Sequence, residues 1–219
     1  MHKIIIFGTG EIAQLAKFYF DNDSIYQVCA FCVDNAFCVD NKFEDLPLVS
    51  FEEVLIYYPP DQYKMFVALS YRNMNKLRQE KYIEAKNKGY ELVSYISTRS
   101  TILNNYSIGD NCFILEDNTI QPFVKIGSNV IIWSGNHIGH HSNILDNVFV
   151  SSHVVISGHC NIGSNSFLGV NSTIGHNVDI GISNIIGAGS IITKNTEENS
   201  VYLPSKSVKI NKFSNEINL

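Results

Sequence analysis

A large aliphatic residue recurs at every sixth position between residues 102 and 192. The sixteen positions are Ile102, Ile108, Ile114, Ile120, Ile126, Ile132, Ile138, Ile144, Val150, Ile156, Ile162, Leu168, Ile174, Ile180, Ile186 and Ile192. A period of six fits neither the two-residue repeat of a single strand nor the 3.6-residue repeat of an α-helix. Six-residue repeats are instead typical of a parallel β-helix, in which short strands stack into a continuous coil. The register therefore predicts a β-helix over about ninety residues.

Two further positions of each six-residue unit support this prediction. The residue four places after the aliphatic one is usually small or apolar, as at Cys112, Val130 and Cys160, and is expected to share the interior. The residue three places after it usually tolerates a left-handed backbone. These corner residues are Asn105, Asn111, Asp117, Asn129, Gly135, His141, Asn147, His153, His159, Asn165, Asn171, Asn177, Gly189 and Asn195, whereas Phe123 and Ser183 break the rule. A tight corner every six residues predicts a triangular coil of eighteen residues, with successive coils about 4.8 Å apart.

The first hundred residues carry a different pattern, in which apolar strands alternate with helical segments. The expected strands cover residues 3–7, 27–33, 48–49, 64–69 and 90–96, and the expected helices run to about residue 20, over 51–56 and over 75–88. Such alternation favours a parallel sheet covered by helices on both faces. We therefore predict a Rossmann-like α/β domain over 1–97, a β-helix over 98–195 and a tail over 196–219, in which 201–203 is a candidate strand.

A glycine-rich turn links the first expected strand to the first expected helix. Gly8, Gly10 and Ala13 have the spacing of the dinucleotide-binding fingerprint, and Asp34 ends the next strand, where such folds contact a ribose. Glycines at this turn let a phosphate approach the backbone at the positive end of a helix. A nucleotide-bearing ligand is the favoured interpretation. The alternatives are a nicotinamide cofactor, for which the domain offers only half of a binding fold, and a purely structural turn.

A second polar segment follows the fourth expected strand. Tyr71 and Arg72 are expected to lie above the carboxyl ends of the parallel strands, where ligands bind in open α/β sheets. Asn73 is expected to cap the helix that begins near residue 75. The alternative is an ordinary helix cap flanked by solvated charges.

Composition narrows the classes of partner and compartment. The formal net charge is −5 and the pI is about 5.8, so no broad basic surface points to nucleic acid. Five cysteines in 219 residues do not suggest a disulfide framework. Cys29 and Cys32 have metal-binding spacing but lie in an expected strand, where alternation places them on opposite faces. The apolar run after Met1 is too short for a signal peptide or a membrane span, so a cytoplasmic location is expected.

The histidines of the coil divide into two groups by their position in the six-residue unit. The corner positions are occupied by His141, His153 and His159, where a role in the turn explains them. His140 and His176 occupy the outward position before the corner, where the fold does not require histidine. Gly158 lies eighteen residues from each of them, so the three residues share one edge of the predicted prism. A glycine beside a histidine leaves room for a ligand and exposes a main-chain N–H.

These features together resemble the sugar acyltransferases of the NeuD and PglD type. The resemblance rests on the small α/β domain, the Gly-Thr-Gly turn after its first strand, the uninterrupted register and the segment Ser-Gly-Asn-His-Ile-Gly-His-His at 134–141. It covers nearly the whole chain and is closest to N-acetyltransferases of nucleotide-linked amino-dideoxy sugars in bacterial glycan or lipopolysaccharide biosynthesis. The fold that it implies is a Rossmann-like α/β domain followed by a left-handed parallel β-helix.

The resemblance also implies roles for individual residues. It implies that the α/β domain holds the nucleotide-sugar, and that the acetyl donor acetyl-CoA lies between the coils of adjacent subunits in a homotrimer. His140 matches the proposed general base, and His141 stands beside it where many members carry a carboxylate, so the group that orients His140 stays open. The implied acetyl-CoA contacts are Gly158, Val170, Gly187 and Ala188, with the Gly158 amide at the thioester. The implied nucleotide-sugar contacts are Gly8, Thr9, Gly10, Glu11, Asp34, Tyr71 and Arg72.

The expected reaction is direct attack of a sugar amine on the thioester, with His140 accepting the proton. Cys160 occupies an inward position and is a poor candidate for an acyl-enzyme nucleophile. One alternative is O-acetylation of a sugar such as a sialic acid. A second is a zinc hydratase of the γ-carbonic-anhydrase kind, but its histidine pair five positions apart is absent, so no metal is expected. A third is a non-catalytic protein that binds a nucleotide-sugar.

Overall fold

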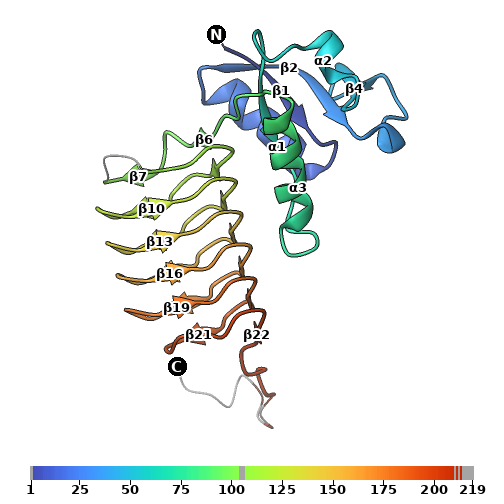
Figure 1. Ribbon diagram of the computed structural model, residues 1–219. Coiled ribbons are helices and arrows are strands. Elements are labelled where there is room, and N and C mark those ends of the chain that lie inside the picture. The colour runs from blue at the N-terminus through green and yellow to red at the C-terminus, as the bar shows by residue number, and fades with distance from the viewer. Residues whose placement is uncertain (1, 104–106, 210, 212, 214–219) are drawn as a thin grey trace.

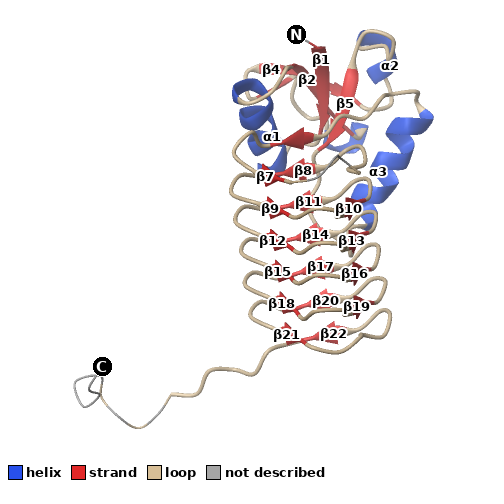
Figure 2. Ribbon diagram, turned by 90° about the vertical axis from the view of Figure 1, so that its left-hand side faces the viewer, coloured by secondary structure: helices blue, strands red, loops and turns tan. Residues whose placement is uncertain are grey.

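The chain folds into a small α/β domain at one end of a long coil, as the computed structural model shows (Figure 1). The structure describes residues 2–103, 107–209, 211 and 213. The expected corner residue Asn105 lies outside the described residues. Figure 2 shows the coil as a ladder of rungs whose strands form three columns beneath the α/β domain.

The α/β domain is built on a five-stranded sheet in the order β3-β4-β2-β1-β5. Its parallel strands are β1 (His2–Phe7), β2 (Tyr26–Val33), β4 (Leu46–Ser50) and β5 (Lys64–Val67), and β3 (Lys42–Phe43) is an antiparallel edge strand. The helices are α1 (Glu11–Asn22), α2 (Val54–Tyr57) and α3 (Lys76–Asn87), and η1 (Asn35–Phe37) is a short 3₁₀ helix. Apolar side chains are buried on both faces of the sheet. Among the described residues, no helix is long and apolar enough to cross a lipid bilayer.

The last strand predicted for this domain is wrong. Of residues 90–96, only Tyr95–Ile96 (β6) forms a strand, and β6 pairs with β8 of the coil. Leu92 makes only an isolated parallel bridge with Met65 of β5. The apolar alternation of this segment suits either sheet, so the sequence pattern alone did not decide between them. The chain thus leaves the α/β sheet one strand earlier than expected and enters the coil directly.

Three parallel sheets form the sides of the coil. The first coil sheet contains β6, β8 (Phe113–Ile114), β11 (Ile131–Ile132), β14 (Phe149–Val150), β17 (Phe167–Leu168), β20 (Ile185–Ile186) and β22 (Val201–Tyr202). The second contains β7 (Thr101–Ile102), β9 (Thr119–Ile120), β12 (His137–Ile138), β15 (Val155–Ile156), β18 (Thr173–Ile174) and β21 (Ile191–Ile192). The third contains β10 (Lys125–Ile126), β13 (Asn143–Ile144), β16 (Asn161–Ile162) and β19 (Asp179–Ile180). The β22 strand and β6 extend the first coil sheet beyond the limits of 98–195 drawn from the sequence.

The register residues fill the interior, and the corners have the predicted backbone. From Ile114 to Ile192 every register residue is buried. All fourteen corner positions from residue 111 to residue 189 have positive φ, including Phe123 (φ 67°) and Ser183 (φ 56°). The stacked rungs therefore impose the left-handed conformation even where the residue type does not favour it. The predicted α/β domain followed by a left-handed β-helix is confirmed.

The expected corner at Asn195 is wrong, because the six-residue repeat breaks there and the positive φ falls instead at Asn199 (φ 56°), before β22. Asn195 is not among the residues with positive φ. Its side-chain oxygen instead accepts a hydrogen bond of 2.9 Å from the Asp179 N–H, and the Thr196 hydroxyl accepts one of 2.9 Å from the Gly181 N–H. Side chains thus replace the carbonyl acceptors that a further strand of the third coil sheet would supply.

The α/β domain packs on the first coil sheet because that sheet presents an apolar outer surface. Its outward residues include Phe113, Ile131 and Phe149, which join one buried cluster with Phe20 of α1. The outward residues of the third coil sheet are instead polar or charged, namely Lys125, Asn143, Asn161 and Asp179. Burial of apolar area, at about 25 cal/mol per Å², favours docking on the first sheet alone.

A buried arginine fixes the docked position. Arg78 of α3 donates to the main-chain carbonyls of Asn129 (3.1 Å) and Asn147 (3.0 Å) on the coil, and burial lowers the pKa of its guanidinium to about 9. Asn75, and not the expected Asn73, occupies the cap position of α3 and has a left-handed backbone (φ 62°). Its side chain does not cap the helix but donates to the Asn165 carbonyl at 3.1 Å. The side chains of Arg78 and Asn75 therefore hold α3 against the coil through hydrogen bonds to its main-chain carbonyls.

The left-handed corners predict a reciprocal pair of stability changes. Replacing Ser183 by Asn should raise the melting temperature, because asparagine adopts this backbone at lower cost than serine. Replacing Asn171, which is exposed and has φ 56°, by Ser should lower it. An effect of about 1 kcal/mol corresponds to about 2–4 °C in a chain of this size, measurable by thermal unfolding. Shifts of the same sign in both variants would contradict the explanation.

Candidate active site

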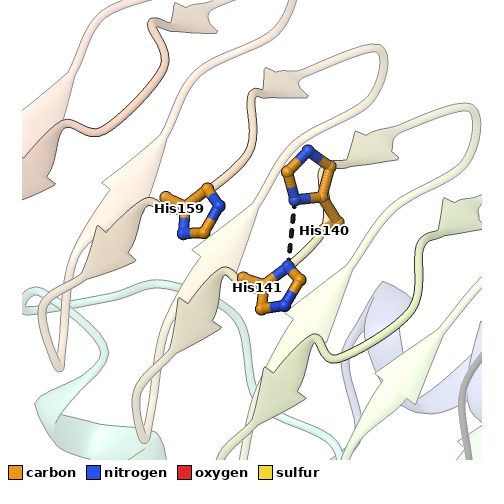
Figure 3. A group of neighbouring side chains, drawn as sticks. All are labelled: His140, His141 and His159. Carbon is orange, nitrogen blue, oxygen red and sulfur yellow. Dashed lines mark hydrogen bonds between the residues drawn. The ribbon is translucent and has the colours of Figure 1, made fainter.

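One edge of the coil gathers the histidines into a column. This histidine edge joins the second and third coil sheets and comprises His140, His141, Gly158, His159 and His176, contributed by three successive coils. All four imidazoles are exposed. Figure 3 shows the rings of His140, His141 and His159 grouped together on this edge. The eighteen-residue repeat thus places side chains that are far apart in sequence within contact distance.

His140 lies directly against the main chain of Gly158. A Cβ atom built on Gly158 would stand 2.8 Å from Cε1 and 2.9 Å from Nε2 of the His140 ring, so any larger residue would displace the imidazole. Within the described part of the chain, no hydrogen bond uses the Gly158 N–H. The structure thus brings the exposed His140 imidazole against buried Gly158, whose N–H is not used in a hydrogen bond among the described residues.

The partner of His140 is a second imidazole. Nδ1 of His140 lies 3.0 Å from Nδ1 of His141, so the N–H of one ring donates a hydrogen bond to the other ring. His141 in turn stacks on His159, with ring centroids 4.8 Å apart and planes 8° from parallel. The pKa of His159 is lowered, first by loss of solvation and then by repulsion from His141, His140 and His176. The ring nitrogen in contact with Nδ1 of His140 thus belongs to His141, whereas the sequence left open which group orients His140.

A different edge carries the predicted acetyl-CoA path. This groove edge joins the first and second coil sheets, and its groove of about 370 Å³ is lined by residues that include Trp133, Phe167, Val170 and Ala188. Gly187 does not line the groove. It is buried, and a Cβ atom on it would stand 2.8 Å from the Leu203 side chain. The structure thus places Val170 and Ala188 in one groove but sets Gly187 beneath the chain that follows β22.

The seven predicted nucleotide-sugar residues line two adjoining pockets at the carboxyl ends of the α/β strands. The larger pocket, of about 650 Å³, is bordered by Gly10, Glu11, Tyr71 and Arg72 together with Trp133 and Phe149 of the coil. The smaller one, of about 350 Å³, is bordered by Gly8, Thr9, Gly10, Asp34 and Arg72 together with Phe37 and Lys81. The larger pocket shares Tyr71, Trp133 and Phe149 with the groove. The pockets and the groove therefore border one another.

Backbone geometry and charge shape the smaller pocket. Gly8 has φ 123°, and a Cβ atom there would stand 2.8 Å from the Ala68 carbonyl oxygen, so the turn requires glycine. Gly10 precedes α1, and a Cβ atom on it would meet nothing within 4 Å, so the helix N-terminus is open. Asp34 pairs with Lys81 of α3 at 2.7 Å. The pocket thus combines an open helix N-terminus with both signs of charge.

The histidine edge and the pockets lie on different sides of one chain. The pockets adjoin the first coil sheet and the groove edge, whereas His140 lies beyond the second coil sheet. Figure 2 shows the strands of the three coil sheets as separate columns. A single chain therefore does not bring His140 together with the groove residues or with the predicted nucleotide-sugar residues.

The sequence prediction missed two groups of residues. His159 was assigned only to a turn, although its position eighteen residues after His141 places the two rings in contact. Phe149 and Phe167 were not predicted as pocket residues, although both precede a register residue on the same column as Phe113. Applying the eighteen-residue period to outward positions would have identified both groups.

The repeats also match a known protein family. Residues 105–140 match the bacterial transferase hexapeptide family, described as six repeats. A comparison with curated proteins gives no match.

Three solved structures share the fold of nearly the whole chain. A variant of perosamine N-acetyltransferase from Caulobacter crescentus, in complex with CoA and GDP-perosamine, matches with a TM-score of 0.78 and 21% identity, covering 94% of this chain and 96% of that one. The acetyltransferase domain of PglB from Neisseria gonorrhoeae FA1090, in complex with acetyl coenzyme A, gives 0.77 and 18%, covering 94% and 99%. WeeI from Acinetobacter baumannii AYE gives 0.76 and 20%, covering 92% and 96%.

At these identities the likeness is one of fold. The chain therefore shares the fold of these solved proteins, in which an α/β domain precedes a left-handed β-helix, and part of its coil matches the transferase hexapeptide repeats.

Proposed function

We propose that the chain is an acetyl-CoA-dependent N-acetyltransferase of a nucleotide-linked amino-dideoxy sugar, acting in the cytoplasm in bacterial glycan or lipopolysaccharide assembly. The observation that carries the proposal is the His140 imidazole set against an unused Gly158 amide on a rigid edge. Support also comes from solved proteins of the same fold, of which one holds CoA and GDP-perosamine and another holds acetyl-CoA.

The proposed chemistry needs only a base and a hydrogen-bond donor. The sugar amine attacks the thioester carbonyl, the new C–N bond forms, and His140 accepts the proton that the amine loses. The Gly158 N–H donates to the oxyanion of the tetrahedral intermediate, which collapses as the C–S bond breaks and the CoA thiolate takes up a proton. A general base contributes about 10²–10⁴-fold, and one oxyanion donor contributes about 10²–10³-fold.

The contacts of His140 favour Nε2 as the basic atom. Nδ1 is engaged with Nδ1 of His141, so we assign its proton to that contact and the free lone pair to Nε2. The Gly158 main chain lies beside the same nitrogen. Cys160 is buried, and burial raises the pKa of its thiol, so direct attack is favoured over an acyl-cysteine intermediate.

We further propose that each active site forms between two subunits of a homotrimer. The second coil sheet separates the histidine edge from the groove edge, so packing this sheet around a threefold axis would bring one edge of each kind together. Its outward residues suit such a contact, because apart from His137 they are threonines or aliphatic residues, namely Thr101, Thr119, Val155, Thr173 and Ile191. The groove spans three rung spacings from the level of Trp133 to that of Ala188, about 14 Å, which suits an extended pantetheine chain.

A thiol-release assay tests the function directly. With acetyl-CoA as donor, we expect turnover on at least one UDP-, dTDP- or GDP-linked 3- or 4-amino-dideoxy sugar. The matching hydroxyl sugars should be much poorer acceptors, because a neutral amine is the stronger nucleophile. Preference for the hydroxyl sugars would indicate O-acetylation, and binding without turnover on the whole panel would indicate a non-catalytic protein.

Replacing His140 by Ala should lower turnover at least about a hundredfold, because the amine loses its proton acceptor. The oligomeric state, measured by light scattering, should not change, since His140 is exposed and outside the corner position. His176→Ala is the matched control, because it removes an exposed imidazole from the same slot two coils away and should retain turnover. Near-normal activity of the His140→Ala protein would remove His140 from the role of base.

Mixed oligomers test whether two chains share each site. His140→Ala disables the histidine edge, and Val170→Arg should block the groove edge, so each variant alone should be inactive. When both are co-expressed in equal amounts, each site draws its two edges from different chains, and about a quarter of the sites become intact. Recovery of about a quarter of wild-type turnover is therefore expected. A mixture as inactive as its components would contradict a site between subunits.

A further inference from the structure

We infer that His140, His141 and His159 form a binding site for a divalent transition-metal ion of the Zn²⁺ class. One nitrogen from each of the three imidazoles lies within 4.8 Å of the other two. All three side chains are exposed, so an ion can reach them from solvent. Figure 3 shows the three rings gathered on adjacent coils.

The spacing of these nitrogens is close to that required by one ion. Zinc binds histidine nitrogen at about 2.0–2.1 Å, so two nitrogens of a tetrahedral site stand about 3.4 Å apart. The Nδ1 atoms of His140 and His141 are already 3.0 Å apart. The ring of His159 stacks on His141 and is exposed, so a side-chain rotation could bring one of its nitrogens to the same ion.

The backbone beneath the rings is fixed by the coil. The His159 N–H donates to the His140 carbonyl at 2.9 Å, which locks the two neighbouring coils together at this corner. Both His141 and His159 have the left-handed backbone of a corner, with φ of 60°. Only side-chain torsions therefore remain to be ordered when an ion binds, which keeps the entropic cost of binding low.

The donor set selects the kind of ion. It contains three imidazoles and no carboxylate, a combination that suits Zn²⁺, Ni²⁺ or Cu²⁺ and disfavours Mg²⁺ and Ca²⁺, which prefer oxygen ligands. Three protein ligands leave a fourth position for water or another group. His176 is the nearest further imidazole, with its ring centroid 5.4 Å from that of His159.

Metal binding and base catalysis exclude each other at His140. A neutral imidazole has one nitrogen lone pair, and an ion that occupies it leaves none to accept the proton of the amine. Occupancy of the site is therefore expected to inhibit acetyl transfer reversibly. This consequence rests on the proposed function, whereas metal binding itself does not.

Calorimetric titration of the full chain with Zn²⁺, without any substrate, tests the site. We expect about one ion per chain, and no comparable binding of Mg²⁺. His159→Asn should weaken Zn²⁺ binding at least about tenfold, because it removes one ligand but keeps a residue that suits the left-handed corner. His153→Asn is the matched control, since it makes the same change at a corner on the other edge and should bind Zn²⁺ normally.

Two results would overturn the site: absence of Zn²⁺ binding by the wild-type chain, or equal binding by the wild-type and His159→Asn proteins. If His159→Asn melts at a lower temperature than the control, His141→Asn provides a second ligand deletion at a corner position. Inhibition is tested separately in the thiol-release assay. Zn²⁺ should suppress turnover, a chelator should restore it, and His159→Asn should resist the ion. Zn²⁺ binding by a chain with no transferase activity would support the site and refute the proposed function.

Discussion

The structure depends on a left-handed corner at every sixth residue. Each corner joins one side of the triangular coil to the next, and three sides complete a coil of eighteen residues. Residues eighteen apart therefore lie above one another at the strand spacing of about 4.8 Å. At that spacing of the backbone, aromatic rings on neighbouring coils can stack and side-chain amides can form hydrogen bonds. It places His141 on His159 and links Asn111 to Asn129, whose side chains are joined by a hydrogen bond of 2.8 Å. A chemical site on this coil is therefore a column of side chains, and its composition follows from one period in the sequence.

Much of the fold could be predicted because this period leaves few alternatives. The corners at Phe123 and Ser183 adopt the predicted conformation against their residue type, since ladder hydrogen bonds on both sides outweigh about 1–2 kcal/mol of local preference. Prediction failed where a neighbouring element decides the outcome. Tyr95–Ile96 could pair with either sheet, and Asn195 has no further strand to support a corner. Both errors lie at the ends of the coil, where the repeat no longer determines the partner.

Much of the candidate site could also be predicted, because the positions of its residues follow from the sheet edge and from the eighteen-residue period. The residues predicted to contact a nucleotide-sugar converge because the carboxyl ends of parallel strands meet at one sheet edge. His140 and Gly158 converge because they are eighteen residues apart. Gly187 was assigned to the groove by its match to related proteins, but Leu203 covers it. His159 was overlooked because its turn role was taken as a sufficient explanation. A corner residue can adopt the left-handed backbone and still present an exposed side chain, and the stacked imidazoles of His141 and His159 do both.

The arrangement makes activity a property of the proposed assembly and not of one chain. The pockets are completed within a chain by α3, which Arg78 holds against the coil, whereas the imidazole that would act on their contents lies past the second coil sheet. Two rigid coils can meet in several vertical alignments, each differing by one rung. A slip of one rung would move His140 by about 4.8 Å relative to the groove, more than a proton transfer can tolerate. The proposed trimer must therefore fix the relative height of its coils. The outward residues of the second coil sheet change from rung to rung, from Thr119 to His137, Val155 and Thr173, and so make one height differ from the next.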